Sequence, residues 1–199
     1  MTEFFAAVVI AAGAVFVAEF GDKSQLLILA FATRYPAIPV IVGLVIGVAV
    51  ITGLSVLVGA AVGAILPTEV VAIVAGISFI GVGLWTLRGH DDDEDPESDA
   101  AKAGRKVGLG LVLTVATTFI LGELGDKTML VTFGLAASQG PLPTWIGATI
   151  GEVAANLLAV AVGRGVGSRL DPRTVRIVSA ALFIAGGIAV LAAALLGGE

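Results

Sequence analysis

The sequence predicts an all-α integral membrane protein with six transmembrane helices, arranged as two inverted three-helix repeats. Three observations lead to this fold class. Hydrophobic residues make up 57% of the 199-residue chain and charged residues only 14%, with a mean hydropathy of +1.05. This leaves too little polar surface to close around a soluble core. Six apolar segments approach bilayer length, and one constant offset of 104 residues relates the two halves of the chain.

The apolar segments are separated by breaks that contain proline or acidic residues. We expect spanning helices at residues 4–33, 39–65, 70–87, 107–137, 144–163 and 175–196. The first and fourth segments would each measure about 45 Å as continuous helices, against a hydrocarbon core of about 30 Å. These two helices must therefore tilt strongly or break, and Gly21 and Gly125 are the predicted breaks.

The internal repeat sets the domain organisation. The offset of 104 aligns these pairs without a gap: Glu19 with Glu123, Pro39 with Pro143, Gly43 with Gly147, Gly47 with Gly151, Gly59 with Gly163, Gly63 with Gly167, Leu66 with Leu170, Phe79 with Phe183 and Gly83 with Gly187. Because each unit has an odd number of spans, the second unit must cross the membrane in the opposite sense, as in secondary transporters. We expect a first repeat at 1–88, an acidic linker at 89–106 and a second repeat at 107–199, together forming one membrane domain.

Glycines spaced four apart occur at equivalent places in both halves, as in the pair Gly43 and Gly47 and the pair Gly147 and Gly151. Small residues at this spacing allow helix backbones to approach closely in a membrane. We therefore expect these glycines to pack helices together; a hinge role remains the alternative.

The basic residues of the loops predict the orientation. After the spans or at their edges, these basic residues are Arg34, Arg88, Lys102, Arg105, Lys106, Arg164, Arg169, Arg173 and Arg176. With six spans, all of them lie on one side of the membrane, and the positive-inside rule makes that side cytoplasmic. We expect a bacterial inner-membrane protein with both termini periplasmic and the acidic linker cytoplasmic.

A charged hexapeptide occurs once in each half, at residues 19–24 (Glu-Phe-Gly-Asp-Lys-Ser) and 123–128 (Glu-Leu-Gly-Asp-Lys-Thr). Charged groups at the centre of a bilayer helix cost about 2.5 to 3.5 kcal/mol on insertion scales, and they usually mark an ion or proton pathway. On a continuous helix the Glu, Asp and Lys of each copy would share one face. Inverted pseudo-symmetry would bring both copies together near the midplane.

The charges of the two hexapeptides suggest an exchange chemistry. Four carboxylates and two ammonium groups sum to -4 + 2 = -2, which one divalent cation or two protons would cancel. A buried cluster that is neutral with either has a physical reason to exchange one for the other. Carboxylates, hydroxyls and free backbone carbonyls are hard donors that suit Mn²⁺, Ca²⁺ or Mg²⁺. The predicted metal ligands are Glu19, Asp22, Ser24, Glu123, Asp126 and Thr128, and Lys23 and Lys127 would balance their charge.

A purely structural role for the hexapeptide is the alternative. Glu19 could form an intrahelical ion pair with Lys23, and Asp22 or Ser24 could cap a broken helix. That interpretation leaves the excess of acid in each copy unexplained.

Glu152 is a further acidic residue inside an apolar segment. Its repeat mate is Val48, so any role is asymmetric, and Asn156 lies one helical turn further on. Glu152 is a candidate proton acceptor or additional cation ligand, with a hydrogen bond between helices as the alternative.

The pattern Glu-x-Gly-Asp-(Lys or Arg)-(Ser or Thr), present once per half in a small six-helix protein, resembles the Gdt-type divalent cation/proton exchangers. This family includes Golgi and chloroplast manganese and calcium transporters and bacterial manganese exporters. Both copies fit the pattern at every specified position. The resemblance implies that Glu19, Asp22, Glu123 and Asp126 bind the transported cation, and that a protein of this size exports Mn²⁺ from the cytoplasm.

We therefore expect a secondary transporter that exchanges Mn²⁺ or Ca²⁺ for protons, with no permanently bound cofactor and no nucleic-acid partner. A divalent cation channel or uniporter is the alternative within transport. An intramembrane acid/base enzyme is a weaker one, because the chain has no cysteine and no histidine within a span. A homo-oligomer is compatible with the sequence but is not predicted by it.

Overall fold

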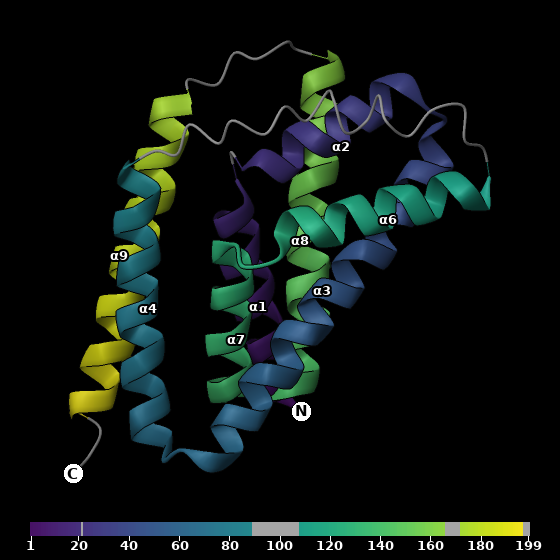
Figure 1. Ribbon diagram of the computed structural model, residues 1–199. Coiled ribbons are helices and arrows are strands. Elements are labelled where there is room, and N and C mark those ends of the chain that lie inside the picture. Colours follow the sequence, from purple (N-terminus) through teal and green to yellow (C-terminus); the bar gives the residue numbers. More distant parts are fainter. Residues whose placement is uncertain (21, 89–107, 166–171, 197–199) are drawn as a thin grey trace.

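The computed structural model describes residues 1–20, 22–88, 108–165 and 172–196, and the regular structure in these residues is helical (Figure 1). The first half contains α1 (Thr2–Glu19), α2 (Lys23–Arg34), α3 (Ala37–Ile65) and α4 (Thr68–Arg88). The second half contains α6 (Leu109–Glu123), α7 (Lys127–Gln139), α8 (Pro141–Gly165) and α9 (Pro172–Leu196). Helices thus occupy all six predicted segments, and the first and fourth segments are each divided in two. The predicted acidic linker lies outside the described residues.

Prolines set several of the helix ends. Pro36 precedes α3, Pro67 follows the last residues of α3, and Pro141 opens α8. A proline has a fixed backbone angle that suits the first turn of a helix and lacks the N–H that a helix interior requires. The connections from α2 to α3, from α3 to α4 and from α7 to α8 are therefore short.

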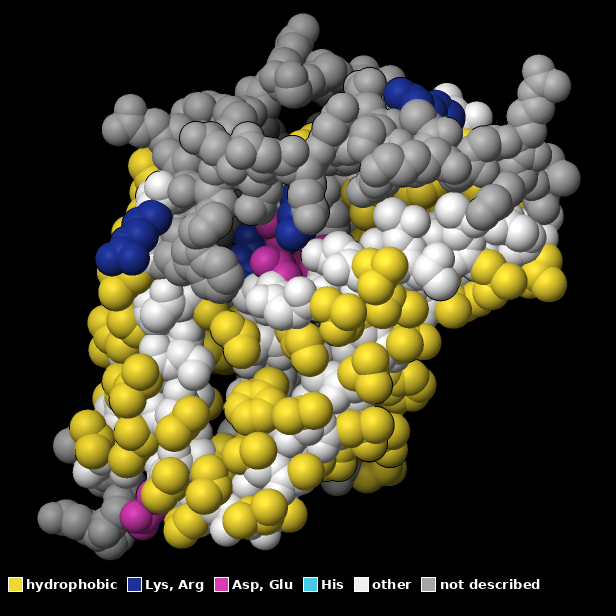
Figure 2. All heavy atoms as spheres, viewed as in Figure 1, with side chains coloured by type: hydrophobic (Ala, Val, Ile, Leu, Met, Phe, Trp, Pro, Cys, Tyr) yellow, Lys and Arg dark blue, Asp and Glu magenta, His cyan; other side chains and the backbone are white. Residues whose placement is uncertain are grey.

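The outer surface of the described helices is strongly apolar (Figure 2). Three of these helices are individually long and apolar enough to cross a membrane, namely Thr2–Glu19, Ala37–Ile65 and Pro141–Ala161. The pair α6 and α7, bent by 80° at its break, would add a fourth span. Exposed side chains such as Leu57 and Ile38 suit contact with lipid tails. The structure is therefore that of an all-helical membrane protein, and the count of six spans stays a prediction.

Helices from opposite halves of the chain pack against each other. α1 lies along α8, α3 lies along α6 and α7, and α4 lies along α9 (Figure 1). Two apolar clusters fill the bundle. One joins α2, α3 and α6 around Phe31 and Phe119, and the other joins α1, α4, α7 and α8 around Val15 and Phe79.

Several of the closest helix contacts occur in pairs that are related by 104 residues. A Cβ atom on Gly43 would lie 2.7 Å from the carbonyl oxygen of Val112, and one on Gly147 would lie 2.3 Å from that of Val8. Other glycine contacts in the same relation are Gly47 with Ala116, Gly151 with Ala12, Gly83 with Ala180 and Gly187 with Gly76. No side chain fits at the tightest of these contacts, so the predicted packing role of the glycines is confirmed for those that the structure describes.

Candidate cation site

The second hexapeptide forms a tight turn between α6 and α7. Leu124 has φ -61° and ψ 116°, Gly125 has φ +82°, and the N–H of Asp126 donates to the carbonyl oxygen of Glu123 at 3.1 Å. These values are those of a type II β-turn, whose third residue needs a positive φ that glycine adopts without strain. The predicted helix break at Gly125 is confirmed, and the turn explains why glycine stands between the two acids.

The first hexapeptide forms an equivalent break. α1 ends at Glu19 and α2 begins at Lys23, while Phe20 has φ -66° and ψ 120°. The N–H of Asp22 donates to the carbonyl oxygen of Glu19 at 3.1 Å, as in the second copy. Gly21, the other predicted break, lies outside the described residues. Because neither segment is a continuous helix at its motif, the turns, and not one shared helix face, position the acids.

The aspartate of each turn does not cap the helix that follows it. Asp22 and Asp126 occupy the residue before α2 and α7, yet neither side chain forms a capping hydrogen bond. The alternative in which Asp22 caps a half-helix through its side chain is therefore wrong. Ser24 also does not cap: its hydroxyl donates to Oε1 of Glu19.

Acidic side chains from both halves of the chain meet in the centre of the bundle. The carboxylates of Glu19, Glu123 and Glu152 have oxygen atoms that all lie within 4.8 Å of one another, and so have those of Asp22, Glu123 and Asp126. The first group is buried, and the second combines buried Glu123 with two partly buried aspartates. Each group contains residues from both repeats, and Glu123 belongs to both groups.

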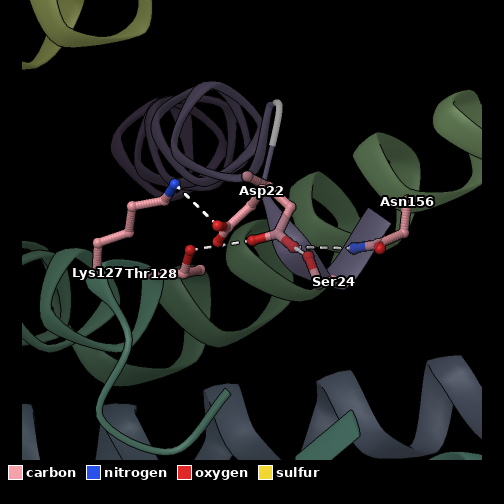
Figure 3. Close-up of polar contacts among 6 residues, drawn as sticks. Asp22, Ser24, Lys127, Thr128 and Asn156 are labelled. Atoms are coloured by element: carbon pink, nitrogen blue, oxygen red, sulfur yellow. Dashed lines mark hydrogen bonds and ion pairs between the residues drawn. The ribbon is translucent and has the colours of Figure 1, made fainter. Parts of the chain in front are cut away.

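Neutral donors hold the Glu19 carboxylate in place. Besides Ser24, Thr128 donates its hydroxyl to Oε2 at 3.0 Å and Asn156 donates its amide to Oε1 at 3.2 Å (Figure 3). The amide of Asn156 is also 3.0 Å from the carbonyl oxygen of Glu152. These hydroxyl and amide groups orient Glu19 without cancelling its charge. Both predicted hydroxyl residues therefore lie at the acids, and each contacts Glu19.

Lys127 forms an ion pair across the repeats. Its Nζ lies 3.2 Å from Oδ1 of Asp22, and the two side chains are mostly buried (Figure 3). Lys23, the equivalent residue of the first copy, begins α2. The predicted charge-balancing role of Lys127 thus has a partner in the structure, and that partner belongs to the other motif.

Two residues of α8 join the site although they lie outside both hexapeptides. Glu152 and Asn156 are four residues apart on one helical face, and both are buried. Sequence alone predicts a site role for Glu152 but none for Asn156. The signal for Asn156 is its spacing, because two polar residues four apart in an apolar segment predict one polar helix face.

A small pocket adjoins two of the acids, Glu123 and Glu152. Its cavity volume is about 10 Å³, and it is lined by Ile51, Thr52, Ser55, Glu123, Thr128, Met129, Thr132 and Glu152. Several buried oxygens at or near the pocket have no hydrogen-bond partner among the described residues: Oε2 of Glu123, both oxygens of Glu152 and the hydroxyl of Thr132. Buried polar atoms normally have partners, so these oxygens are available to a ligand.

The arrangement is suited to hold a hard cation. Carboxylate and hydroxyl oxygens are the ligands that Mn²⁺, Ca²⁺ and Mg²⁺ prefer. Grouping several buried carboxylates is costly unless a positive charge accompanies them. Acidic and basic atoms are visible side by side in a hollow of the face shown in Figure 2.

The comparisons with known proteins agree with this chemistry. A family model described as "Divalent cation/proton antiporter GDT1" matches the chain over residues 7–94 and 111–197. The chain belongs to the GDT1 family. The two matched stretches begin 104 residues apart and contain one hexapeptide each.

Individual relatives of the GDT1 family support the assignment. A GDT1-like protein of Synechocystis is 34% identical over 84% of this chain and 87% of its own length. A protein of Vibrio cholerae, named as a proposed manganese exporter, is 30% identical over 84% of this chain and 81% of its own length. The chloroplast protein PAM71 of Arabidopsis thaliana is 31% identical over 85% of this chain and 52% of its own length. No solved structure gave a significant match.

Membership of the GDT1 family confirms the resemblance that the hexapeptides indicated. The family is one of membrane transporters for divalent cations and protons, and not of enzymes. The intramembrane acid/base enzyme is therefore excluded as the main function. The individual roles of the site residues stay predictions.

Proposed function

We propose that this protein exchanges a divalent cation for protons at a single site formed where the two motif turns meet. The proposal is supported chiefly by the composition of the two acidic groups, because each group contains at least one acid from the first half of the chain and at least one from the second. In this site Glu19, Asp22, Glu123 and Asp126 are the ligands, and Ser24 and Thr128 assist them. Mn²⁺ is the first expected substrate and Ca²⁺ the second.

The charge balance gives the exchange its physical basis. Four motif carboxylates and two lysines leave an excess of two negative charges, as the sequence predicts. A cation with two positive charges removes the excess, and so do two protons. Because an empty, fully ionised cluster is costly inside the bundle, return of the empty carrier across the membrane favours a protonated site.

We further propose that the site lies at the centre of an inverted repeat of six spans, with both termini periplasmic. The reciprocal packing of α1 on α8 and α3 on α6 supports this arrangement, as do the glycine contacts related by 104 residues. Each motif break would then lie partway along a divided span. Broken helices at the midplane are typical of secondary transporters.

Manganese export from the cytoplasm is the direction that we propose. The resemblance to bacterial exporters and the name of the Vibrio cholerae relative support it. The hard donor set is compatible with Mn²⁺ and Ca²⁺ alike, so the substrate is settled only by direct competition between the two ions.

Coupled flux in liposomes tests this function. The purified protein is reconstituted, a Mn²⁺ or Ca²⁺ gradient is applied, and ion entry and internal pH are followed together with two dyes. We expect the lumen to become more alkaline as the cation enters, because protons leave in exchange. Metal entry without any proton movement would instead indicate a channel or uniporter. Glu19→Gln should abolish the coupled flux, and full activity in this variant would contradict the proposed site. Glu69→Gln, which alters an exposed acid of α4, is its matched control.

A further inference from the structure

Glu152 is the buried acid that the two motifs leave unexplained. Its side chain is 1% exposed, and neither carboxylate oxygen has a hydrogen-bond partner among the described residues. A role as a hydrogen-bonding residue between helices would require such a partner. Glu152 instead lines the pocket together with Glu123, and its carboxylate lies within 4.8 Å of those of Glu19 and Glu123.

The acids divide into two groups with different surroundings. Asp22 and Asp126 are partly exposed, and Asp22 forms the ion pair with Lys127. Glu19 and Glu152 are both buried. They are 152 - 19 = 133 residues apart in the chain, and the packing of α1 against α8 brings them together. Glu123 belongs to both groups, and its Oε2 has no partner among the described residues.

We propose that Glu152 is a cation ligand that completes a second, inner position for the transported ion. The inner position consists of Glu19, Glu123 and Glu152, and the outer position consists of Asp22, Glu123 and Asp126. One divalent cation occupies one position at a time, and Glu123 stays bound as the ion moves between them. This inference rests on the proposed function for the identity of the ion, a hard divalent cation such as Mn²⁺.

The electrostatics favour a cation at the inner position. Three ionised carboxylates carry a charge of -3, and one divalent cation reduces it to -1. The donors to Glu19 are neutral, so they orient the ligand without competing for its charge. The pocket next to Glu152 adds the hydroxyl of Thr132, which is fully buried and has no partner among the described residues. A hard cation at this place would satisfy these oxygens.

The inner position has no counterpart in the first half of the chain. Glu152 is equivalent to Val48, which is fully buried in the apolar cluster of α2, α3 and α6. The first half therefore offers no matching acid. An ion that passes between the two motif turns would meet the extra carboxylate only on the side of α8.

Equilibrium binding of Mn²⁺ to the purified full-length protein tests the role of Glu152. Calorimetry gives the affinity, and pulsed electron paramagnetic resonance in H₂O and D₂O gives the number of waters on bound Mn²⁺. We expect Glu152→Gln to weaken binding by at least about tenfold, since loss of even an indirect partner of a metal ligand costs that much. We also expect an additional water on the ion. Glu69→Gln should match the wild type in both measurements.

Unchanged affinity and hydration in Glu152→Gln would overturn the proposal, because a merely structural role would leave the water count as it is. If Glu152→Gln does not fold, Glu152→Leu replaces it, since this variant removes both carboxylate oxygens and keeps a side chain that suits the apolar segment; a wild-type affinity and water count there would overturn the proposal equally. Failure of the proposed exchange is seen separately, as wild-type protein that binds Mn²⁺ through Glu152 but moves no protons in liposomes.

Discussion

Lys127 of the second motif contacts the first motif through an ion pair with Asp22. Its ammonium group lies 3.2 Å from Oδ1 of Asp22, which is a ligand in the proposed cation site. In that proposal the lysine competes with the ion for this carboxylate. It also lowers the cost of the acidic group when no metal is bound, because a largely buried carboxylate without a counter-charge is strongly unfavourable.

Replacing Lys127 by glutamine should separate these two effects. We expect Lys127→Gln to bind Mn²⁺ several-fold more tightly than the wild type, because the competing charge is gone. The metal-free variant should melt at a lower temperature, because Asp22 loses its partner. Calorimetry and melting curves with and without Mn²⁺ measure both changes. Weaker binding together with unchanged melting would show that the ion pair does not compete with the cation.

At the scale of the element, the motif is a turn that divides a helix. The Glu of each copy ends one helix, the Asp precedes the next, and the hydrogen bond between them closes the turn. In the second copy Gly125 is required for its backbone angle, φ +82°, and not for space, because a Cβ atom there would meet nothing within 4 Å.

Gly125→Ala therefore tests the turn itself. A positive φ in a residue with a side chain costs about 1–2 kcal/mol, so we expect a lower apparent melting temperature and weaker Mn²⁺ binding. Gly122→Ala is the matched control: it also meets nothing within 4 Å, but it lies inside α6 without a positive φ. Alanine favours a helix interior over glycine, so this variant should be as stable as the wild type or more so. Equal behaviour of the two variants would contradict the turn assignment.

The packing of α1 on α8 gives a second prediction at this scale. A Cβ atom on Gly151 would lie 2.2 Å from the carbonyl oxygen of Ala12, so Gly151→Ala requires the two helix backbones to move apart. Since Glu152 is the next residue, the movement should also weaken cation binding. Gly13→Ala, where a Cβ atom meets nothing within 4 Å, is the control. Melting temperature and Mn²⁺ affinity that are unchanged in Gly151→Ala would contradict this close contact.

For the whole molecule, the repeat was the most informative feature of the sequence. The offset between the motifs predicted that they meet, and the excess length of two segments predicted where helices divide. Symmetry could not place Glu152, because its mate is Val48, nor pair Lys127 with Asp22 rather than with an acid of its own copy. Those contacts depend on how each packed helix is rotated about its own axis. A uniformly apolar segment gives no local sequence pattern from which that rotation can be predicted.

The charge of the whole site predicts how binding depends on pH. Carboxylates must be deprotonated to bind a metal, so Mn²⁺ binding should release protons and its affinity should increase as the pH rises. Titration calorimetry in buffers of different ionisation enthalpy measures the protons released for each ion bound. An affinity that is independent of pH, with no proton release, would contradict competition between the cation and protons.

The central claim is that the two motifs build one site, and the number of ions bound tests it most directly. Mn²⁺ is titrated into the wild type, into Glu19→Gln from the first motif and into Asp126→Asn from the second. We expect one ion per chain in the wild type and weaker binding in either variant alone, because each residue belongs to a group that contains acids of the other motif. Two ions per chain in the wild type, with each variant losing only one of them, would contradict the account.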